Sequence, residues 1–327
     1  MALALSGCAM PPPPSVLATP PPPAISAGAF VMPDGTHLLY RVWRPNGEPK
    51  AIVLALHGFN DSRDAFEVPG PDFAARGIEV IAPDQRGFGD TPQRGLWPGR
   101  RMLVADARRM AQLVRAEHPR TKLYLMGESM GAAVLVCLAA SPDPAPVTGY
   151  ILVSPAVWGR SEMNLFERMG LWLMSSTVPG LTADGSIVRV TASDNRKAIY
   201  RLSTDPLTIH DTRWGTVKGL VNLMDAALAD SGRIHAPALF LYGGKDELIP
   251  KRAARAAEVA LPRRVRTAYY PRDYHLMLRD LGRQKPIDDI LAWMADPDAP
   301  LPSGADAAAQ AWLDLPGDNR PKLLAAH

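Results

Sequence analysis

The sequence predicts an α/β fold, in which a mostly parallel central sheet carries helices on both faces and a helical cap insertion. Continuous apolar runs, typical of strands buried on both faces, alternate with helical patterns from residue 51 onward. The alternation stops over residues 156–232 and resumes at residue 237, so this stretch is expected to be a cap. A chain of 327 residues is long enough for one large domain with such an insertion.

This pattern divides the chain into a Pro-rich N-terminal segment, 1–29; a core, 30–155 and 233–296; a helical cap, 156–232; and a C-terminal tail, 297–327. Two proline runs make the N-terminal segment stiff and unable to join a core, so it is expected to be disordered. The tail, rich in Pro, Ala and Asp, is expected to be loose, with Trp312 as a residue that would dock back.

The core elements follow in order. A hairpin is predicted over residues 30–43, turning at Asp34-Gly35, and a helix is expected before Gly77. Apolar runs predict strands at 51–56, 78–82, 123–126, 150–153, 237–242 and 265–270. Helical spacing predicts helices at 100–117, 252–260 and 287–294, and within the cap at 164–174 and 216–229. The Met, Trp and Phe content of the cap fits either its own core or an apolar wall that faces a substrate.

Composition excludes several classes of function. Hydrophobic residues make up 47% of the chain, which is typical of a soluble globular protein, and no apolar run reaches membrane-spanning length. A formal net charge of +3 is too small to indicate nucleic-acid binding. The two cysteines form no disulfide framework or metal spacing, and Cys137 is expected to be a small buried residue.

The other cysteine lies in the stretch Leu5-Ser6-Gly7-Cys8, which resembles the lipobox of bacterial lipoproteins. A lipidated Cys8 followed by a proline-rich spacer would make a membrane tether. Only seven residues precede Cys8, however, and none is Lys or Arg, whereas a secretory signal has a basic start. Two interpretations stay open: a truncated or misassigned start, which would make a membrane-anchored lipoprotein, and a chance match, which would leave a cytoplasmic protein.

The pentapeptide Gly127-Glu128-Ser129-Met130-Gly131 stands between a predicted strand and a helix rich in Ala and Leu. In this context a serine occupies a sharp, strained turn and projects its oxygen above the sheet edge. The glycines are required because a Cβ at either place would clash where strand and helix cross. Ser129 is therefore the candidate nucleophile, although an ordinary strand–turn–helix connection with a serine N-cap would read the same way.

A serine nucleophile needs a base to take its proton, and the base needs an acid to fix its tautomer. Such groups gather at the carboxyl ends of strands in open α/β sheets. Three loops at predicted strand ends hold the needed types, in the order Ser129, Asp246 and His275. This order predicts a catalytic triad in which Asp246 is the acid and His275 is the base.

Other acids and histidines fit these roles less well. Glu247 is expected to point elsewhere on its loop, and Asp273 is too close to His275 in sequence to come from a separate strand end. Surface or structural roles are expected for the histidines that end a helix or lie in or beside the cap, namely His118, His210 and His235.

An oxyanion hole needs two N–H groups aimed at one carbonyl oxygen. The expected donors are Met130, directly after the nucleophile, and Phe59, in the loop after the strand at 51–56. His57-Gly58 is then a turn that orients this loop, or else an ordinary β-turn. The glycine-rich loop 83–90 lacks the third glycine of a dinucleotide site and is expected to be an ordered turn near the site.

These motifs together, which are His57-Gly58-Phe59, the pentapeptide around Ser129, Gly243-Gly244-Lys245-Asp246 and the late His275, resemble the α/β-hydrolase superfamily. The similarity covers about residues 30 to 295, and the branch it resembles most is the monoacylglycerol lipase/lysophospholipase-like serine hydrolases. Many relatives carry His at the position of Glu128. The resemblance implies hydrolysis of carboxylic esters with no cofactor and no metal.

The expected activity is cleavage of esters of apolar acyl groups, such as a monoacylglycerol or a lysophospholipid, through an acyl-enzyme. The expected partner is a small-molecule ester or lipid, with membrane association if Cys8 is lipidated, and without nucleic acid. The alternatives are another activity on this fold (aminopeptidase, thioesterase or haloperoxidase) and a non-catalytic small-molecule binder. Such binders usually lose a triad member, and all three residue types are present here.

Overall fold

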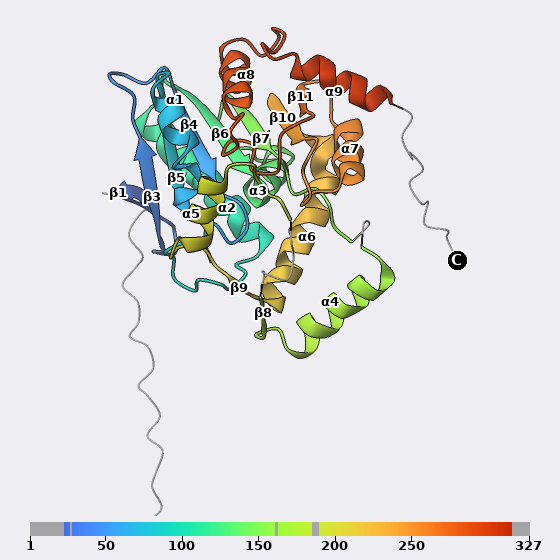
Figure 1. Cartoon of the computed structure of the whole chain (residues 1–327). Helices are drawn as coiled ribbons and strands as arrows, with labels where there is room; N and C mark the ends of the chain where they lie inside the picture. Colours follow the sequence, from blue (N-terminus) through green and yellow to red (C-terminus); the bar gives the residue numbers. More distant parts are fainter. Residues whose placement is uncertain (1–22, 27, 161–162, 185–189, 316–327) are drawn as a thin grey trace, which may run out of the picture.

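The computed structural model describes residues 23–315, apart from positions 27, 161–162 and 185–189. One sheet runs through it in the order β1 (Ala24–Ser26), β2 (Ala29–Val31), β3 (His37–Trp43), β5 (Ile78–Pro83), β4 (Ala51–Leu56), β6 (Lys122–Glu128), β7 (Gly149–Val153), β10 (Ala238–Gly243) and β11 (Val265–Tyr270) (Figure 1). The strands from β5 to β11 are parallel, and β1, β2 and β3 join as antiparallel neighbours. The prediction of a mostly parallel sheet is confirmed.

Alternate side chains of each central strand enter two different hydrophobic cores. In β4, Ile52 and Leu54 face one core and Val53 and Ala55 face the other. The first core is covered by α2 (Arg100–Glu117), α3 (Met130–Ala139), α6 (Trp214–Asp230) and α7 (Lys251–Ala260). The second is covered by η1 (Arg63–Phe66), α1 (Pro69–Ala74) and α8 (Gln284–Ala295). Both faces of the sheet therefore carry helices, as predicted.

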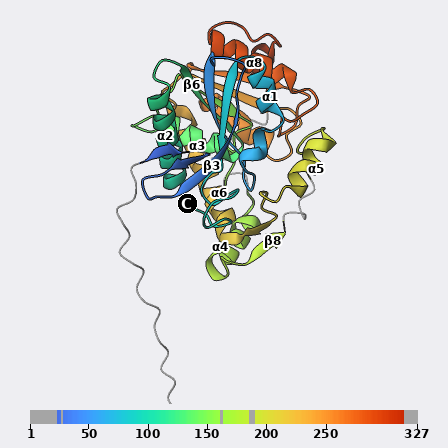
Figure 2. The ribbon, with the colours of Figure 1, turned by 90° about the vertical axis from the view of Figure 1, so that its left-hand side faces the viewer.

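The cap segment, residues 156–232, holds α4 (Leu165–Thr177), α5 (Arg196–Thr204) and α6, and a short antiparallel pair, β8 (Thr182–Asp184) and β9 (Asp211–Arg213). The predicted cap helices at 164–174 and 216–229 correspond to α4 and α6, whereas α5 and the strand pair were not predicted. Figures 1 and 2 place α4 at the end of the molecule opposite α8.

The apolar residues of the cap divide between two environments. In α6, Val221, Leu223 and Met224 are buried and join the core on one face of the sheet, rather than a separate core of the cap. In α4 the buried apolar residue is Leu171, so a core of the cap does not account for this helix, and an apolar wall that faces a substrate stays a prediction. The large apolar side chains of α4 that face solvent are Leu165, Phe166, Met169, Trp172 and Leu173, at 49–77% exposure. Helical periodicity predicts that an apolar face exists but does not identify what covers it.

The N-terminal segment that was expected to be disordered contributes a strand, because β1 pairs with β2 through Ala24–Val31, Ile25–Phe30 and Ser26–Ala29. The exposed edge of β2 offers hydrogen-bonding groups that a short extended segment can satisfy. Cys8 lies outside the residues that the structure describes. Over the described ranges, none of the helices combines the length and apolar composition needed to cross a bilayer.

The C-terminal tail is also more ordered than predicted, because α9 (Ala305–Asp314) packs against β11. Trp312 stacks on Tyr269 with ring centroids 4.6 Å apart, which confirms that this residue docks back. Trp312 joins the core on one face of the sheet and Ala305 joins the core on the other, so α9 lies across the free edge beyond β11.

Candidate active site

Ser129 stands between β6 and α3 with φ 55° and ψ −112°, a conformation that non-glycine residues rarely adopt. Such a backbone costs roughly 1–3 kcal/mol and persists only where its surroundings enforce it. The Ser129 N–H donates to the carbonyl of Val153, 3.0 Å away, and this bond ties the turn to β7. A Cβ on Gly127 would come within 2.5 Å of the Gly131 carbonyl carbon, and one on Gly131 would overlap the carbonyl of Leu56. The glycines thus allow the tight strand–helix crossing that the sequence predicted.

Asp246 and His275 meet at the carboxyl ends of β10 and β11. The Nδ1 atom of His275 lies 2.7 Å from Oδ2 of Asp246, and both side chains are buried. The other oxygen of Asp246 accepts the N–H groups of Leu248 and Ile249, each at 2.8 Å, so the carboxylate is held in place. A carboxylate at Nδ1 keeps the proton on that nitrogen and leaves Nε2 free to accept another.

The charge state of His275 reflects opposing influences. Burial works to lower its pKa, but the charge of Asp246 and the hydrogen bond to it, with a further contribution from Glu128, raise the pKa above its ordinary value. A base with a raised pKa holds an abstracted proton more strongly. The site therefore stabilises the imidazolium that forms when a serine hydroxyl is deprotonated.

Ser154 connects the loop of His275 to the strand beside Ser129. It follows β7 directly, and its Oγ donates to the carbonyl of His275 at 2.8 Å. Its own backbone has φ 43°, another strained position, and its N–H donates to Leu241 of β10 at 2.9 Å. The segments that carry Ser129 and His275 are thus joined through the ends of neighbouring parallel strands. This role of Ser154 was not predicted from the sequence.

The loop after β4 lies beside Ser129, since a Cβ on Gly58 would sit 3.5 Å from the Cβ of Ser129. Phe59 follows in this loop, and its ring packs edge-on against Phe88 at 5.7 Å between centroids. Met130 begins α3, whose N-terminus has no side-chain cap, so its first N–H groups are available to a ligand. The two expected oxyanion donors therefore belong to segments that flank Ser129.

His57 holds this loop to the neighbouring glycine-rich loop. Its Nε2 accepts the N–H of Gln85 at 3.0 Å, which requires that Nδ1 carry the proton and donate to the carbonyl of Gly58 at 2.7 Å. The Gln85 side chain returns a bond to the carbonyl of His57 at 2.7 Å. Burial lowers the pKa of His57, which keeps the ring neutral. His57 orients the loop, and Gln85 is a partner that the sequence did not reveal.

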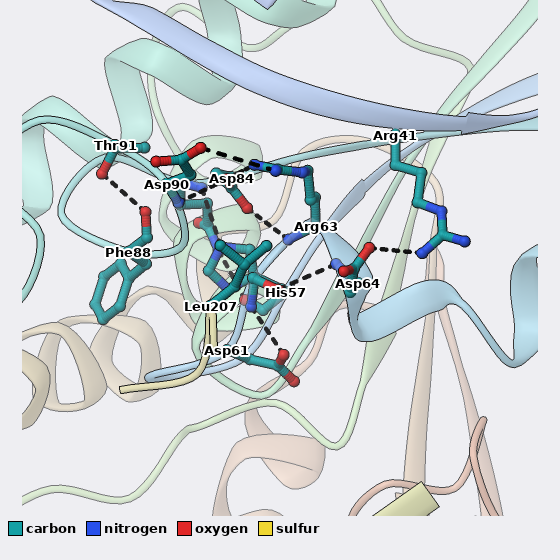
Figure 3. A network of polar contacts seen from close by, with 12 residues as sticks. Arg41, His57, Asp61, Arg63, Asp64, Asp84, Phe88, Asp90, Thr91 and Leu207 are labelled. Carbon is teal, nitrogen blue, oxygen red and sulfur yellow. Dashed lines mark hydrogen bonds and ion pairs between the residues drawn. The ribbon is translucent and has the colours of Figure 1, made fainter. Parts of the chain in front are cut away.

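A polar network extends this connection (Figure 3). Asp84, which is fully buried, accepts the N–H of Arg63 at 2.7 Å, the Arg63 guanidinium and the N–H of Asp90 at 2.9 Å. Arg41 of β3 donates to Oδ1 of Asp64 at 2.7 Å, and Asp64 is the neighbour of Arg63 in η1. The glycine-rich loop is thus an ordered turn beside the candidate site, and it fixes the segment that carries Phe59.

The rival residues lie elsewhere. Oε2 of Glu247 accepts the N–H of Thr191, 2.7 Å away, so this side chain points to the cap. His57 and His275 are the buried histidines within the described ranges, since His210 and His235 are exposed and His118 is half-buried. Cys137 is buried as predicted, and burial raises the pKa of its thiol to about 12. Across the described residues, no group of three or more His, Cys, Asp or Glu is placed to hold a metal ion.

A buried ion cluster that the sequence did not predict lies beside Ser129. Glu128, noted only as unusual, contacts Arg279 at 3.1 Å, and Arg279 contacts Asp61 at 2.5 Å. A signal was present, because Arg279 lies four residues after His275 and directly follows the buried apolar residues 276–278. A charge placed inside a buried run requires partners of opposite charge.

Comparison with known proteins places this geometry in context. The profile of the family described as "Serine aminopeptidase, S33" matches residues 47–282. The chain is 26% identical over 272 residues to a monoglyceride lipase of Rattus norvegicus, spanning 80% of this chain and 88% of that protein. It is 23% identical over 278 residues to a monoacylglycerol lipase of Mycolicibacterium smegmatis, spanning 82% and 96%.

Solved structures resemble the chain over similar spans. The crystal structure of Paleococcus ferrophilus monoacylglycerol lipase has a TM-score of 0.65 at 21% identity, covering 79% of this chain and 98% of that one. A soluble variant of monoglyceride lipase from Saccharomyces cerevisiae, in complex with a substrate analog, has a TM-score of 0.67 at 16% identity, covering 88% and 98%. At these identities the likeness shows that the fold is shared.

Proposed function

This chain belongs to the serine aminopeptidase family of α/β-hydrolases, and on that premise we propose that it cleaves esters of apolar acyl groups through an acyl-enzyme on Ser129. It is a lipase/esterase-type enzyme, a carboxylic ester hydrolase. Monoacylglycerols or lysophospholipids are the proposed substrates. The observation that carries the catalytic part is the buried 2.7 Å contact between His275 and Asp246, on strand ends next to a strained serine turn.

The proposed reaction has two steps. Ser129 Oγ attacks the ester carbonyl while His275 Nε2 takes its proton, and the N–H groups of Met130 and Phe59 hold the oxyanion. The tetrahedral intermediate collapses as His275 protonates the leaving alcohol, which gives the acyl-enzyme. Water then attacks the acyl-enzyme with His275 again as base, releasing the carboxylic acid and restoring Ser129. Asp246 keeps Nδ1 protonated throughout.

The exposed face of α4 supports a lipid substrate. Its large apolar side chains stand at positions 165, 166, 169, 172 and 173, a spacing that puts them on one face of the helix. Apolar patches of this kind, on a helix with a Trp among them, favour contact with lipid or with the acyl chains of an aggregate. Attachment through a lipidated Cys8 is a separate part of the proposal, supported by the lipobox-like sequence. Mass spectrometry of the membrane fraction would detect the thioether-linked lipid.

An ester chain-length series tests the proposed activity. Nitrophenyl esters from acetate to palmitate, with monoacylglycerol and lysophospholipid alongside, should be turned over by the natural chain. Ser129→Ala should lower turnover by about 10³-fold or more, with an unchanged circular dichroism spectrum. Turnover retained by Ser129→Ala would refute Ser129 as nucleophile.

The family's description as a serine aminopeptidase favours amide cleavage as the second candidate. An aminoacyl nitroanilide beside the matching ester separates the two, because ester hydrolysis needs no special protonation of a poor amine leaving group. A higher kcat/KM for the amide would replace the ester proposal with the aminopeptidase one.

A further inference from the structure

Arg279 is 4% exposed and joins two carboxylates from different parts of the chain. One guanidinium nitrogen, Nη2, donates to Asp61 Oδ2 at 2.5 Å and to Glu128 Oε1 at 3.1 Å. Asp61 and Glu128 are buried as well. We call these three side chains the guanidinium bridge.

Each member of the bridge adjoins a different part of the proposed machinery. Asp61 lies two residues after Phe59, Glu128 directly precedes Ser129, and Arg279 is four residues beyond the proposed base. The arginine is held at its own backbone too, since its carbonyl accepts the side chain of Asn195 at 2.8 Å. One cation therefore connects the oxyanion loop, the nucleophile turn and the loop of the base.

The bridge leaves buried polar atoms unpaired. Two carboxyl groups share one guanidinium, and burial raises the pKa of Glu128 while Arg279 works against this. The second oxygen of Glu128 and the Nε of Arg279 are buried without a hydrogen-bond partner among the described residues. Burying ionic groups adds little stability over an apolar core of the same shape. An arrangement that leaves buried polar atoms unpaired next to a nucleophile is better explained by a role in the reaction.

We propose that Arg279 is a positioning residue, which holds the loop of Phe59 and the turn of Ser129 in register so that both oxyanion donors meet one carbonyl oxygen. The proposal rests on the proposed ester hydrolysis. Oxyanion donors act at about 2.7–3.1 Å from the oxygen, and a displacement of about 1 Å can lower a rate by about 10²-fold.

The test compares Asp61→Asn with Asp72→Asn in the full chain. Asp72 is the matched control, because it pairs with Arg283 at 2.9 Å between two other segments. For Asp61→Asn we expect kcat on a soluble nitrophenyl ester to fall about 10- to 100-fold, with KM within about twofold. Affinity for an alkyl boronic acid, which places an oxygen in the oxyanion hole, should fall by the same factor, while affinity for a non-reactive ether analogue should not. Asp72→Asn should match the natural chain in all three.

Arg279→Lys keeps the positive charge but replaces the guanidinium nitrogen that donates to both Asp61 and Glu128. We expect its activity to lie between that of Arg279→Met and that of the natural chain. If Asp61→Asn fails to fold, Arg279→Lys decides by the same boronic acid and ether measurements. If the folded variant kept the kcat and the boronic acid affinity of the natural chain, the positioning role of Arg279 would be wrong and the proposed function would stand. If the natural chain itself were inactive on esters, the proposed function would be wrong.

Discussion

Two parts of the cap segment are joined to the rest of the molecule in opposite ways. Residues 191–213, which we call the inner cap, are hydrogen-bonded to the loops of the candidate site at both of their ends. Near one end, Ala192 accepts the N–H of Leu276 at 2.9 Å. Near the other, Thr212 accepts the side chain of Asn60 at 2.6 Å. By contrast, α4 packs on α6 (Figure 1). Five of its large apolar side chains lie in solvent.

The difference suggests that one insertion serves two purposes. The inner cap makes bonds whose geometry is fixed, including Ser193 to Asp280 at 2.5 Å, and it can hold the loops of the candidate site in place. Side chains on the outer face of α4 are 49–77% exposed in the part of the chain that the structure describes, which suits contact with a fluid, non-directional surface. Changes near the site should therefore affect every ester, and changes on α4 should affect aggregated lipid only.

The largest effect is expected for Asp246→Asn. An amide at this position can donate to Nδ1 and hold the wrong tautomer of His275, so kcat should fall about 10³- to 10⁴-fold on soluble and aggregated esters alike. Steady-state kinetics on nitrophenyl butyrate and on monoacylglycerol vesicles measures both. Glu247→Gln is the control, because this neighbour is exposed and bonds to Thr191. If Asp246→Asn lost activity on vesicles but kept it on nitrophenyl butyrate, the proposed difference between the candidate site and α4 would be wrong.

An intermediate effect is expected for Phe166→Ser combined with Trp172→Ser on α4. Each aromatic contributes about 1.5–3 kcal/mol when buried in apolar surroundings, so activity on vesicles should fall about tenfold or more, while nitrophenyl butyrate turnover stays the same. Tyr200→Ser on α5 is the matched control, since Tyr200 is an aromatic of the same cap at 71% exposure. An equal loss on the soluble ester would mean that α4 supports the fold of the site rather than lipid contact.

The smallest effect lies outside the cap, at Glu258 in α7. Burial raises the pKa of Glu258 to about 8 from an ordinary 4.5, while Arg255 works against this. Between those pH values the folded chain holds a proton that the unfolded chain has released, so stability falls as pH rises through this window. Glu258→Gln removes the titration, and its melting temperature should exceed that of the natural chain by on the order of 5 °C at pH 9.

At pH 4, below both pKa values, the two chains should melt together, and both should hydrolyse esters equally at neutral pH. Calorimetry across pH 4–9 checks the first expectation and an ester assay the second. A pH-independent difference in melting temperature would assign the effect to packing of the amide. This variant thus marks what a change in stability alone looks like, against which the cap variants can be judged.

Much of the fold could be predicted because buried parallel strands are continuous apolar runs, and the strand predicted at 265–270 has the bounds of β11. The helix predicted at 100–117 likewise has the bounds of α2. The prediction failed at α9, where composition suggested a loose tail, although Ala305, Ala309 and Trp312 follow helical spacing and are buried. Trp312 stacks on Tyr269, and a contact between residues so far apart in the sequence cannot be predicted from a local pattern.

The candidate site divides in the same way. Motif and chain order singled out Ser129, Asp246 and His275, because each stands in a recognisable strand-end loop. Arg279 was missed, although it follows an apolar run, because its partners Asp61 and Glu128 come from distant loops that no local pattern connects. The outward face of α4 was missed because an apolar stripe looks the same whether it covers a core or meets solvent.

The placement of α9 has a consequence for the solution behaviour of the protein. The last strand of a sheet presents unpaired backbone groups to which a strand of another molecule can add. Because Trp312 lies on one side of the sheet and Ala305 on the other, α9 covers the edge of β11 and keeps a strand of another molecule from pairing with it. We expect a chain shortened before residue 305 to expose the edge of β11 and to self-associate, because α9 would no longer cover that edge.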